Sequence, residues 1–397
     1  MKKGKTMNIL MVTSAFPPYF GGAAVQATYL AKGLQARGVG VEFITDNEER
    51  PSMHEVYQGI PVYRCSSFFD NMAMTAKRSE LIFTLRILLY IMRHWRRHDV
   101  IHFHSIRGTE ALIFPLLKIM GKKLIFKFTL VGSDDPMAFK RRNHMARLYL
   151  WGMTFVDKFI AIASVQVDLT EEAGLQRERV LHLPNGVDTT RYAALAPDAR
   201  AALKAALGLG QYDKIFYSIG KIEDRKNYKF LLQAWKILCR RYPNSAIVFA
   251  GTGNTADREY YRDLLRMIEQ DDLPGVVFLG HRENVDDYMK VSDAFLFASK
   301  AEGFGTVLIE AAVAGVPVVA RNIEGVTEDI LLPEDRDLAR ICYEDDANAF
   351  AAMTIDLLGN YDDAGRARSI KRFQRVYGLE HITGRYVQLY RNLLGKQ

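Results

Sequence analysis

Two glutamates eight residues apart, Glu302 and Glu310, are the side chains whose type and spacing most suggest chemistry. Glu302 opens a loop that contains Gly303 and Gly305, and Glu310 stands in the apolar run 306–314. That run predicts a helix followed by a buried strand, and a charge inside it is costly unless it has a partner. The free N–H groups of a helix N-terminus attract anions. The segment therefore offers two acceptors for hydroxyl groups beside a cradle for an anion, which is what a sugar joined to a phosphate needs.

A simpler interpretation of the two glutamates leaves chemistry out. Glu302 would then cap the helix, and Glu310 would pair with a distant arginine. The spacing alone does not separate the two interpretations, so the surrounding elements have to decide.

Short apolar runs alternate with helical patterns along the whole chain, which predicts parallel sheets buried on both faces. Ligands of such sheets bind beyond the carboxyl ends of the strands. The loops that follow the runs are therefore the places to search for site residues. The predicted strands are 8–13, 39–45, 99–104, 159–163, 214–220, 246–251, 276–280, 294–298 and 316–320.

Glycines and cations occupy several of these loops. Gly21 and Gly22 precede a predicted helix, where glycine lets the backbone approach a phosphate closely. Lys221, Arg225 and Lys226 lie between a strand and a helix, which is where a diphosphate would bind. Taken singly, a glycine pair is more often a simple turn and a charge run is more often a solvated surface.

The segment 299–320 resembles the Glu-x7-Glu signature of the family 4 retaining glycosyltransferases, which have the GT-B fold. The resemblance covers both glutamates, the glycines between them and the run Ala-Gly-Val-Pro-Val at 314–318. The Pro-Pro-x-x-Gly-Gly of 17–22 and the Pro-Asn-Gly-Val-Asp of 184–188 also resemble segments of that family. Most of the chain is covered, least clearly 48–99.

The resemblance implies an α/β fold of two Rossmann-like domains facing a cleft. Residues 1–190 would form the acceptor-side domain, with a final helix at about 378–397 packing back onto it, and 191–377 would bind the nucleotide sugar. No metal or other cofactor is implied. The implied donor contacts are Gly21, Gly22, Gly220, Gly251, Gly253, Arg282, Gly303, Phe304, Gly305, Thr306, Val307 and Glu310.

The implied catalytic group comprises Glu302, Lys226, Lys221, Arg225 and Asp134. Glu302 would accept hydrogen bonds from sugar hydroxyls, Glu310 would hold the ribose, and the cations would stabilise the leaving phosphate. Lys221 stands where the family usually has arginine, and Lys keeps the charge but loses the bidentate fork.

The acceptor side departs from the family pattern. Many members place a histidine after the strand that here begins at Lys123, whereas this chain has Gly-Ser-Asp at 132–134. Backbone donors near Ser133 and the Asp134 carboxylate would substitute for it. His102 and His104 point to the same face of a predicted strand. Two histidines make a weak metal signal, so we expect one of them to line the ligand cleft instead.

The bulk composition excludes several classes of protein. At 397 residues the chain is long enough for two cores, and no apolar run is long enough to cross a bilayer. Pro17 and Pro18 interrupt the apolar start, so we expect a first strand rather than a secretory signal, and a cytoplasmic protein. Three scattered cysteines indicate neither disulfides nor a metal site.

The net charge of +7 is unevenly distributed. Residues 1–192 carry 26 Lys and Arg against 17 Asp and Glu, and the remainder carries 27 against 29. A basic first half predicts an anionic partner, either a membrane surface at the inner face of the plasma membrane or a lipid phosphate. No nucleic-acid motif is present, so nucleic acid is not expected.

Two basic segments of the first half bear on that partner. The apolar stretch 81–95 ends in arginines and is interpreted either as a helix at a membrane interface or, preferably, as a core helix. A second cluster, at Lys140, Arg141, Arg142 and Arg147, has no acidic residues interleaved. A solvated face is its commonest explanation, and membrane docking is the alternative.

The predicted function is retaining transfer of a hexose-type sugar from a nucleoside diphosphate, with UDP as the expected nucleotide, to a hydroxyl acceptor that is soluble or lipid-linked. Such a reaction fits bacterial cell-surface polysaccharide or glycolipid assembly. The alternatives are an inactive nucleotide-sugar-binding module and a phosphorylase-type enzyme of the same fold. A dehydrogenase is disfavoured because Gly251-Thr252-Gly253 lacks the third glycine of the dinucleotide fingerprint.

Overall fold

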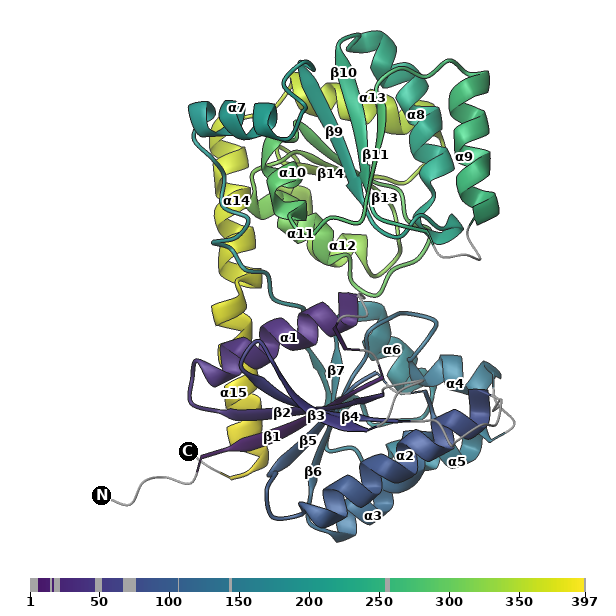
Figure 1. The fold of residues 1–397 in the computed structure, drawn as a ribbon, viewed down its shortest axis with the longest axis vertical. Helices are drawn as coiled ribbons and strands as arrows, with labels where there is room; N and C mark the ends of the chain where they lie inside the picture. Colours follow the sequence, from purple (N-terminus) through teal and green to yellow (C-terminus); the bar gives the residue numbers. More distant parts are fainter. Residues whose placement is uncertain are drawn as a thin grey trace. The chain divides into compact units, whose positions relative to one another are not determined.

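Short apolar runs form the strands of two separate sheets, as the sequence predicts. The computed structural model describes residues 6–14, 16–17, 22–46, 52–66, 76–105, 107–142, 145–253 and 258–395, without the side chains of 76–78 and 142. The chain folds as two compact units: unit 1 is Met1–Gly186 with Leu379–Gln397, and unit 2 is Val187–Gly378. Each unit has an α/β architecture with helices on both faces of its sheet (Figure 1).

Unit 1 contains an eight-stranded sheet in the order β3-β4-β2-β1-β5-β6-β7-β8. Every pairing is parallel except that of β3 with β4. The chain enters at β1 in the middle, builds outward in one direction and then returns to add β5 on the other side. The strands are β1 Asn8–Thr13, β2 Gly40–Asp46, β3 Met53–Tyr57, β4 Ile60–Cys65, β5 Val100–His104, β6 Lys123–Lys127, β7 Lys158–Ala161 and β8 Val180–His182.

Helices cover the two faces of this sheet with separate apolar cores. One face packs against α1 (Gly22–Gln35) and the C-terminal helix α15 (Leu379–Leu393), through Leu30, Leu34 and Tyr386 among others. The other face carries the remaining helices, which share a second core. These are α2 Ala76–Arg93, η1 Thr109–Ile113, α3 Phe114–Ile119, α4 Pro136–Arg142, α5 Ala146–Met153 and α6 Ser164–Glu172.

Unit 2 contains a six-stranded, wholly parallel sheet in the order β11-β10-β9-β12-β13-β14. Its order reverses between β9 and β12, so the loops after these two strands diverge at a topological switch point. Open α/β sheets bind ligands at such a point. The strands are β9 Lys214–Ile219, β10 Ser245–Ala250, β11 Val276–Gly280, β12 Ala294–Phe297, β13 Val318–Arg321 and β14 Ala339–Cys342.

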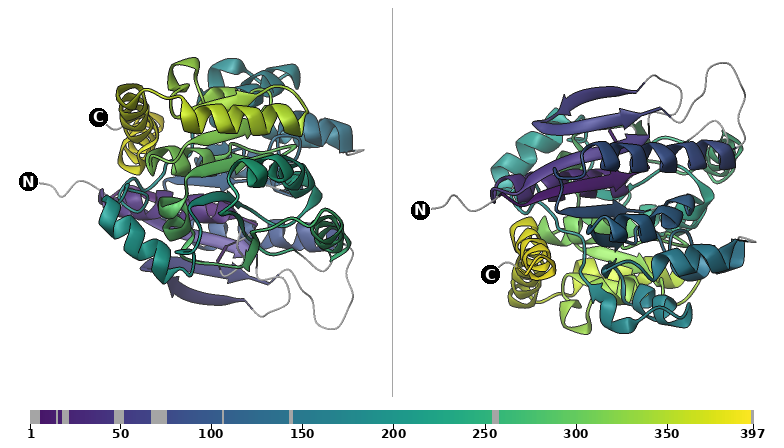
Figure 2. Two further views of the ribbon diagram at one scale, coloured as in Figure 1. Left: turned by 90° about the horizontal axis from the view of Figure 1, so that it is seen from above. Right: turned by 90° about the horizontal axis from the view of Figure 1, so that it is seen from below.

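The helices of unit 2 also form two layers, which can be followed in the left view of Figure 2. Apolar side chains of α8 (Tyr228–Arg241), α9 (Arg258–Gln270) and α13 (Ala347–Gly359) form the core on one face of the sheet. The remaining helices are α7 Pro197–Ala206, α10 Val285–Val291, α11 Thr306–Val313, α12 Thr327–Ile330 and α14 Asp363–Tyr377.

The chain passes from α14 to α15 at Gly378, since α14 ends at Tyr377 and α15 begins at Leu379, close to the start expected for the final helix. Gly378 leaves the helical conformation at ψ 134°, and a Cβ there would lie 2.5 Å from the carbonyl oxygen of Gln374. No helix in the described part of the chain combines the length and hydropathy that a membrane-spanning segment needs.

Candidate functional site

Three charged side chains meet at the switch point of the unit 2 sheet. Lys226 and Arg225 come from the turn η3 (Asp224–Lys226) in the loop after β9, and Glu302 comes from the loop after β12. The Lys226 ammonium pairs with Glu302 Oε1, and Arg225 Nη1 lies 3.1 Å from Glu302 Oε2. Lys226 and Glu302 are 76 positions apart in the sequence, and the reversal of strand order brings them together.

The Glu302 carboxyl is ionised by its surroundings. Its side chain is only 12% exposed, and burial alone would raise its pKa. Lys226 and Arg225 more than offset that effect, so the pKa lies below its usual value. Glu302 does not cap α11, whose N-cap is Gly305 without a side-chain cap. The simple capping interpretation of this glutamate is therefore wrong.

Hydrogen bonds to backbone carbonyl groups hold the loop after β9 against the loop after β12. The N–H of Lys300 donates to the carbonyl oxygen of Arg225 at 2.8 Å, and Arg225 Nη1 donates to that of Ala301 at 2.8 Å. Arg225 also pairs with Glu223 at 2.7 Å, which fixes its guanidinium from the other side. Arg225 and Lys226 therefore lie on a loop whose position is fixed by contacts with the loop after β12.

Asn227 closes that loop in the left-handed conformation, at φ 56°. Asparagine tolerates this region better than most residues, and glycine tolerates it best. The geometry thus explains why Asn stands here where the resembling family usually has Gly.

Two of the predicted donor glycines have a packing role. A Cβ on Gly251 would lie 1.8 Å from the carbonyl oxygen of Gly220, and one on Gly220 would lie 2.7 Å from Cε of Lys226. These glycines let the ends of β9 and β10 approach each other and leave room for the lysine stem. Gly253 and Lys221 are exposed nearby, and Arg282, also exposed, donates to the carbonyl oxygen of His281.

The N-terminus of α11 adjoins Glu302 in the chain. Gly303, Phe304 and Gly305 are buried, whereas Thr306 and Val307 are half-buried. Gly305 adopts φ 81°, which turns the chain into the helix at a position that favours glycine. The first N–H groups of a helix have no partner within it and carry partial positive charge. This helix end therefore adds donors beside the charged cluster.

Glu310 lies on α11 among polar neighbours that the sequence did not reveal. Burial raises the pKa of its carboxyl to about 7, although a hydrogen bond from Tyr192 and the charge of Arg191 act in the opposite direction. Arg191 Nη2 lies 2.8 Å from Asp286 Oδ1 and donates to the carbonyl oxygen of Glu283 at 2.9 Å. The position of Arg191 and Tyr192 just after the Pro-Asn-Gly-Val-Asp segment is the one signal that pointed to them.

The remaining predicted site residues, which comprise two donor contacts, one catalytic residue and the acceptor-side group, belong to unit 1. Gly22 is exposed at the start of α1, and Gly21 lies outside the described residues. Asp134 is buried and accepts hydrogen bonds from Thr129 and the Leu130 N–H, so it organises the turn after β6. Burial raises the pKa of Asp134. Ser133 is half-buried in the same turn.

His102 and His104 are fully buried beneath α15. Nδ1 of His102 lies 2.8 Å from the hydroxyl of Tyr390, and the two imidazole rings are 4.1 Å apart. Lys127 lies on the neighbouring strand, with its ammonium donating to Asn185 at 2.7 Å and facing the Tyr386 ring. Both histidines have pKa values well below the usual one, because burial disfavours their charged forms. Among the described residues no group of three His, Cys, Asp or Glu side chains could hold a metal ion.

Comparisons with known proteins cover both units. Residues 199–373 match the family model of group 1 glycosyl transferases, and 21–186 match that of the glycosyl transferase 4-like domain. The N-acetyl-α-D-glucosaminyl L-malate synthase of Bacillus anthracis is 23% identical over 95% of each chain. A phosphatidylinositol N-acetylglucosaminyltransferase chain of Arabidopsis thaliana is 26% identical over 84% of this chain and 71% of its own length.

Solved structures share the fold at lower identity. The crystal structure of HepE from Anabaena in complex with UDP aligns with a TM-score of 0.76 and 17% identity. The alignment covers 97% of this chain and all of that one.

Proposed function

Because the chain belongs to the family 4 glycosyltransferases of the GT-B fold, we propose that it transfers a hexose-type sugar from a nucleoside diphosphate to a hydroxyl group with retention of configuration. The observation that carries this proposal is the convergence of Lys226 and Arg225 on Glu302. It occurs at the switch point of the unit 2 sheet, beside the N-terminus of α11. UDP is the proposed nucleotide, since HepE was crystallised with it.

The cations and α11 would act on the leaving group. When the bond between the anomeric carbon and the diphosphate breaks, negative charge grows on the phosphate oxygen. Lys226, Arg225 and the first N–H groups of α11 are donors that a diphosphate at this loop would meet. Lys221, exposed in the same loop, is a further candidate. Two fixed cations and a helix N-terminus support our proposal that the reaction needs no metal.

The carboxylates would hold the two ends of the donor. Glu302 is ionised and would accept hydrogen bonds from sugar hydroxyls, exchanging part of its pairing with Lys226 for them. Glu310 would accept from the ribose hydroxyls, with Tyr192 orienting its carboxyl.

We propose a same-face displacement for the chemical step. The acceptor oxygen bonds to the anomeric carbon on the side from which the phosphate leaves. The acceptor proton passes to the departing phosphate oxygen, so no side chain forms a covalent bond to the sugar. Trapping a sugar–enzyme adduct by mass spectrometry would overturn this step.

The acceptor is proposed to be a hydroxyl compound held at the cytoplasmic face of a membrane, in the assembly of a cell-surface polysaccharide or glycolipid. Relatives named for malate and for phosphatidylinositol show that family membership alone does not choose between soluble and lipid acceptors. The excess of nine positive charges in residues 1–192 favours an anionic surface.

A thermal-shift screen tests the donor assignment. UDP-, GDP- and ADP-sugars are each added with magnesium or with EDTA, because a ligand that binds the folded state raises its apparent Tm. We expect a shift with UDP-sugars that magnesium does not change. A shift that disappears in EDTA would contradict the metal-free proposal, and no shift with any nucleotide sugar would contradict the donor proposal.

A further inference from the structure

Helix α2 presents an apolar stripe to solvent. Leu81, Leu85, Leu89 and Met92 are 56%, 53%, 54% and 49% exposed. Their spacing of four, four and three residues places them on one side of the helix. Single exposed apolar residues are ordinary, but a continuous row of four large ones indicates a contact surface.

The stripe is not needed to hold α2 on its unit. The opposite side of the helix already carries Phe83, Ile87, Tyr90 and Ile91, all buried in the core that α2 shares with the sheet. The helix is therefore apolar on its inner face and again along its outer face. A core helix requires only the first of these faces.

Cations border the apolar stripe. Arg93, Arg96 and Arg97 are exposed at the C-terminal end of the helix, and Trp95 beside them is 48% exposed. The guanidinium of Arg96 lies 4.9 Å from the centre of the Trp95 ring. Apolar side chains flanked by tryptophan and arginine suit the boundary between acyl chains and headgroups.

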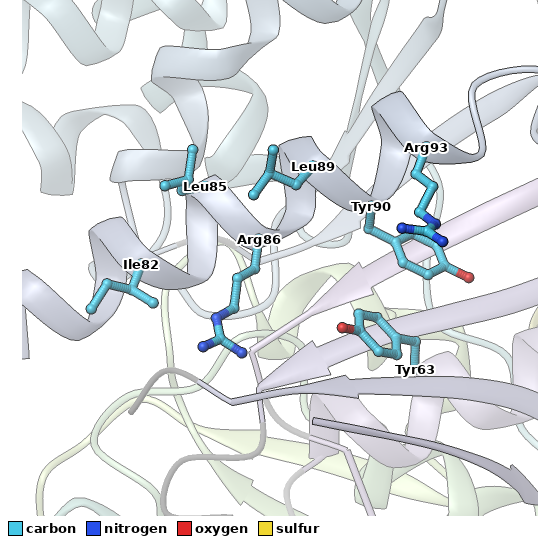
Figure 3. Close-up of a pocket in the computed structure, with 7 residues that line it drawn as sticks. All are labelled: Tyr63, Ile82, Leu85, Arg86, Leu89, Tyr90 and Arg93. Carbon is cyan, nitrogen blue, oxygen red and sulfur yellow. The ribbon is translucent and has the colours of Figure 1, made fainter. Parts of the chain in front are cut away.

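A groove runs along the side of α2 (Figure 3). Its volume is about 410 Å³. Tyr63 of β4 and Tyr90 stack at its floor, with ring centres 4.7 Å apart. Ile82, Leu85 and Leu89 line it together with Arg86 and Arg93. The groove thus places apolar walls and two guanidinium groups side by side.

A second patch of the same kind lies on α5. Leu148 and Trp151 are 40% and 51% exposed, and Met145 just before the helix is 46% exposed. Arg147 is exposed among them, as are Lys140 and Arg141 of α4. Helices α2 and α5 share one core on the same face of the unit 1 sheet. Both helices also pack against η1, so the two patches lie on helices that flank the same short element.

We propose that this side of unit 1, formed by the outer faces of α2 and α5, docks on an anionic lipid bilayer. The apolar stripe of α2 would enter the boundary between headgroups and acyl chains, while Arg93, Arg96 and Arg147 would contact lipid phosphates. Charge complementarity commits the surface to this partner, because the charged side chains that are exposed on the described parts of α2, α4 and α5 are all cations. The proposal deepens the membrane-held acceptor proposed above by naming the surface that reaches it.

Vesicle flotation with the full chain tests the proposal. The probes are phosphatidylcholine vesicles with and without phosphatidylglycerol, at low and at high salt. We expect binding to the anionic vesicles, weakened by salt through screening. The paired changes Leu85→Glu with Leu89→Glu and Arg93→Glu with Arg96→Glu should each lower the partition coefficient about tenfold or more.

Helix α9 supplies matched controls, because Leu265 is 44% exposed and Arg262 is exposed there. Leu265→Glu and Arg262→Glu should leave vesicle binding unchanged. Failure of the wild-type chain to bind anionic vesicles, binding by the α2 variants equal to wild type, or equal loss in the α9 variants would overturn the proposal. So would a dimer in light scattering that Leu85→Glu with Leu89→Glu dissolves.

The UDP-sugar thermal shift of the same variants separates the two proposals. A shift that persists while vesicle binding is lost places the defect at the membrane surface. If the wild-type chain binds vesicles but shows no thermal shift with UDP-sugars, the result would count against the proposed function alone.

Discussion

Individual residues of the candidate site differ in the charge that they carry at neutral pH. Glu302 is held ionised by Lys226 and Arg225, whereas burial raises the pKa of Glu310 to about 7. One carboxyl of the pair is therefore a permanent anion and the other titrates near physiological pH. The eight-residue spacing is visible in the sequence, but this difference is not, because it depends on neighbours from distant loops.

Donor affinity should depend on pH through Glu310. On the proposed assignment its carboxyl, ionised above pH 7, would accept hydrogen bonds from the ribose hydroxyls, and protonation below pH 7 would weaken that role. We expect the Kd of a UDP-sugar to rise up to about tenfold from pH 8 to pH 6, measured by isothermal titration calorimetry. Both phosphates of an intact nucleotide sugar stay ionised across this range. Glu310→Gln should abolish the dependence; an equal dependence in the variant would remove the ribose assignment.

Stability should depend on pH through Lys127. Burial lowers the pKa of Lys127 to about 7, whereas an unfolded lysine titrates near about 10.4. Between these values the unfolded state binds more protons, so this lysine makes stability rise with pH, and its cost is largest below pH 7.

The Lys127→Met variant isolates this effect, because the other titrating groups are common to both proteins. From pH 7 to pH 8.5 the wild type should gain about 1–2 kcal/mol of unfolding free energy relative to the variant. Urea denaturation at the two pH values measures the difference. A difference that does not change with pH would show that Lys127 is charged in the folded protein throughout.

At the scale of elements, the loops after β9 and β10 depend on a close backbone approach. Gly251→Ala would place a Cβ 1.8 Å from the carbonyl oxygen of Gly220 and force the two strand ends apart. We expect a loss of about 2–4 kcal/mol of stability and weaker binding of UDP-sugars. Thermal melting and calorimetry measure the two effects.

Gly359 gives the matched control, because a Cβ there meets nothing within 4 Å. Gly359→Ala at the end of α13 should leave Tm unchanged or raise it slightly. If the two variants have the same Tm, then the backbone of Gly251 does not approach the carbonyl group of Gly220 closely in solution.

Much of the element order follows from the sequence, because buried parallel strands are short apolar runs that stand out from helical patterns. The loops that carry the candidate site are found in the same way, since they follow strands. The start of the final helix near residue 378 was expected from the family resemblance, and α15 begins at Leu379. The buried position of His102 could not be predicted, since Tyr386 and Tyr390 pack against it from the far end of the chain.

For the chain taken together, the proposed division of roles matches the distribution of charge. The basic excess lies in residues 1–192, and the cluster that would bind the donor lies in the nearly neutral remainder. The sequence alone favoured a core role for the helix of 81–95. The structure gives α2 both a buried face and an exposed apolar face. A hydropathy pattern cannot distinguish a core helix from a helix with an exposed apolar face, because residues of both faces appear together in one apolar stretch of sequence.

Lys226 and Glu302 are proposed to serve the donor and not merely each other. Calorimetric titration of a UDP-sugar into wild type, Lys226→Gln and Glu302→Gln, with turnover measured alongside, distinguishes the two roles. Lys226→Gln should weaken binding about tenfold or more, because a charged donor to the diphosphate is lost. Glu302→Gln should keep the Kd within about threefold while turnover falls about a hundredfold. Wild-type affinity in both variants, with equal losses of stability, would contradict the claim by making the pair a structural salt bridge.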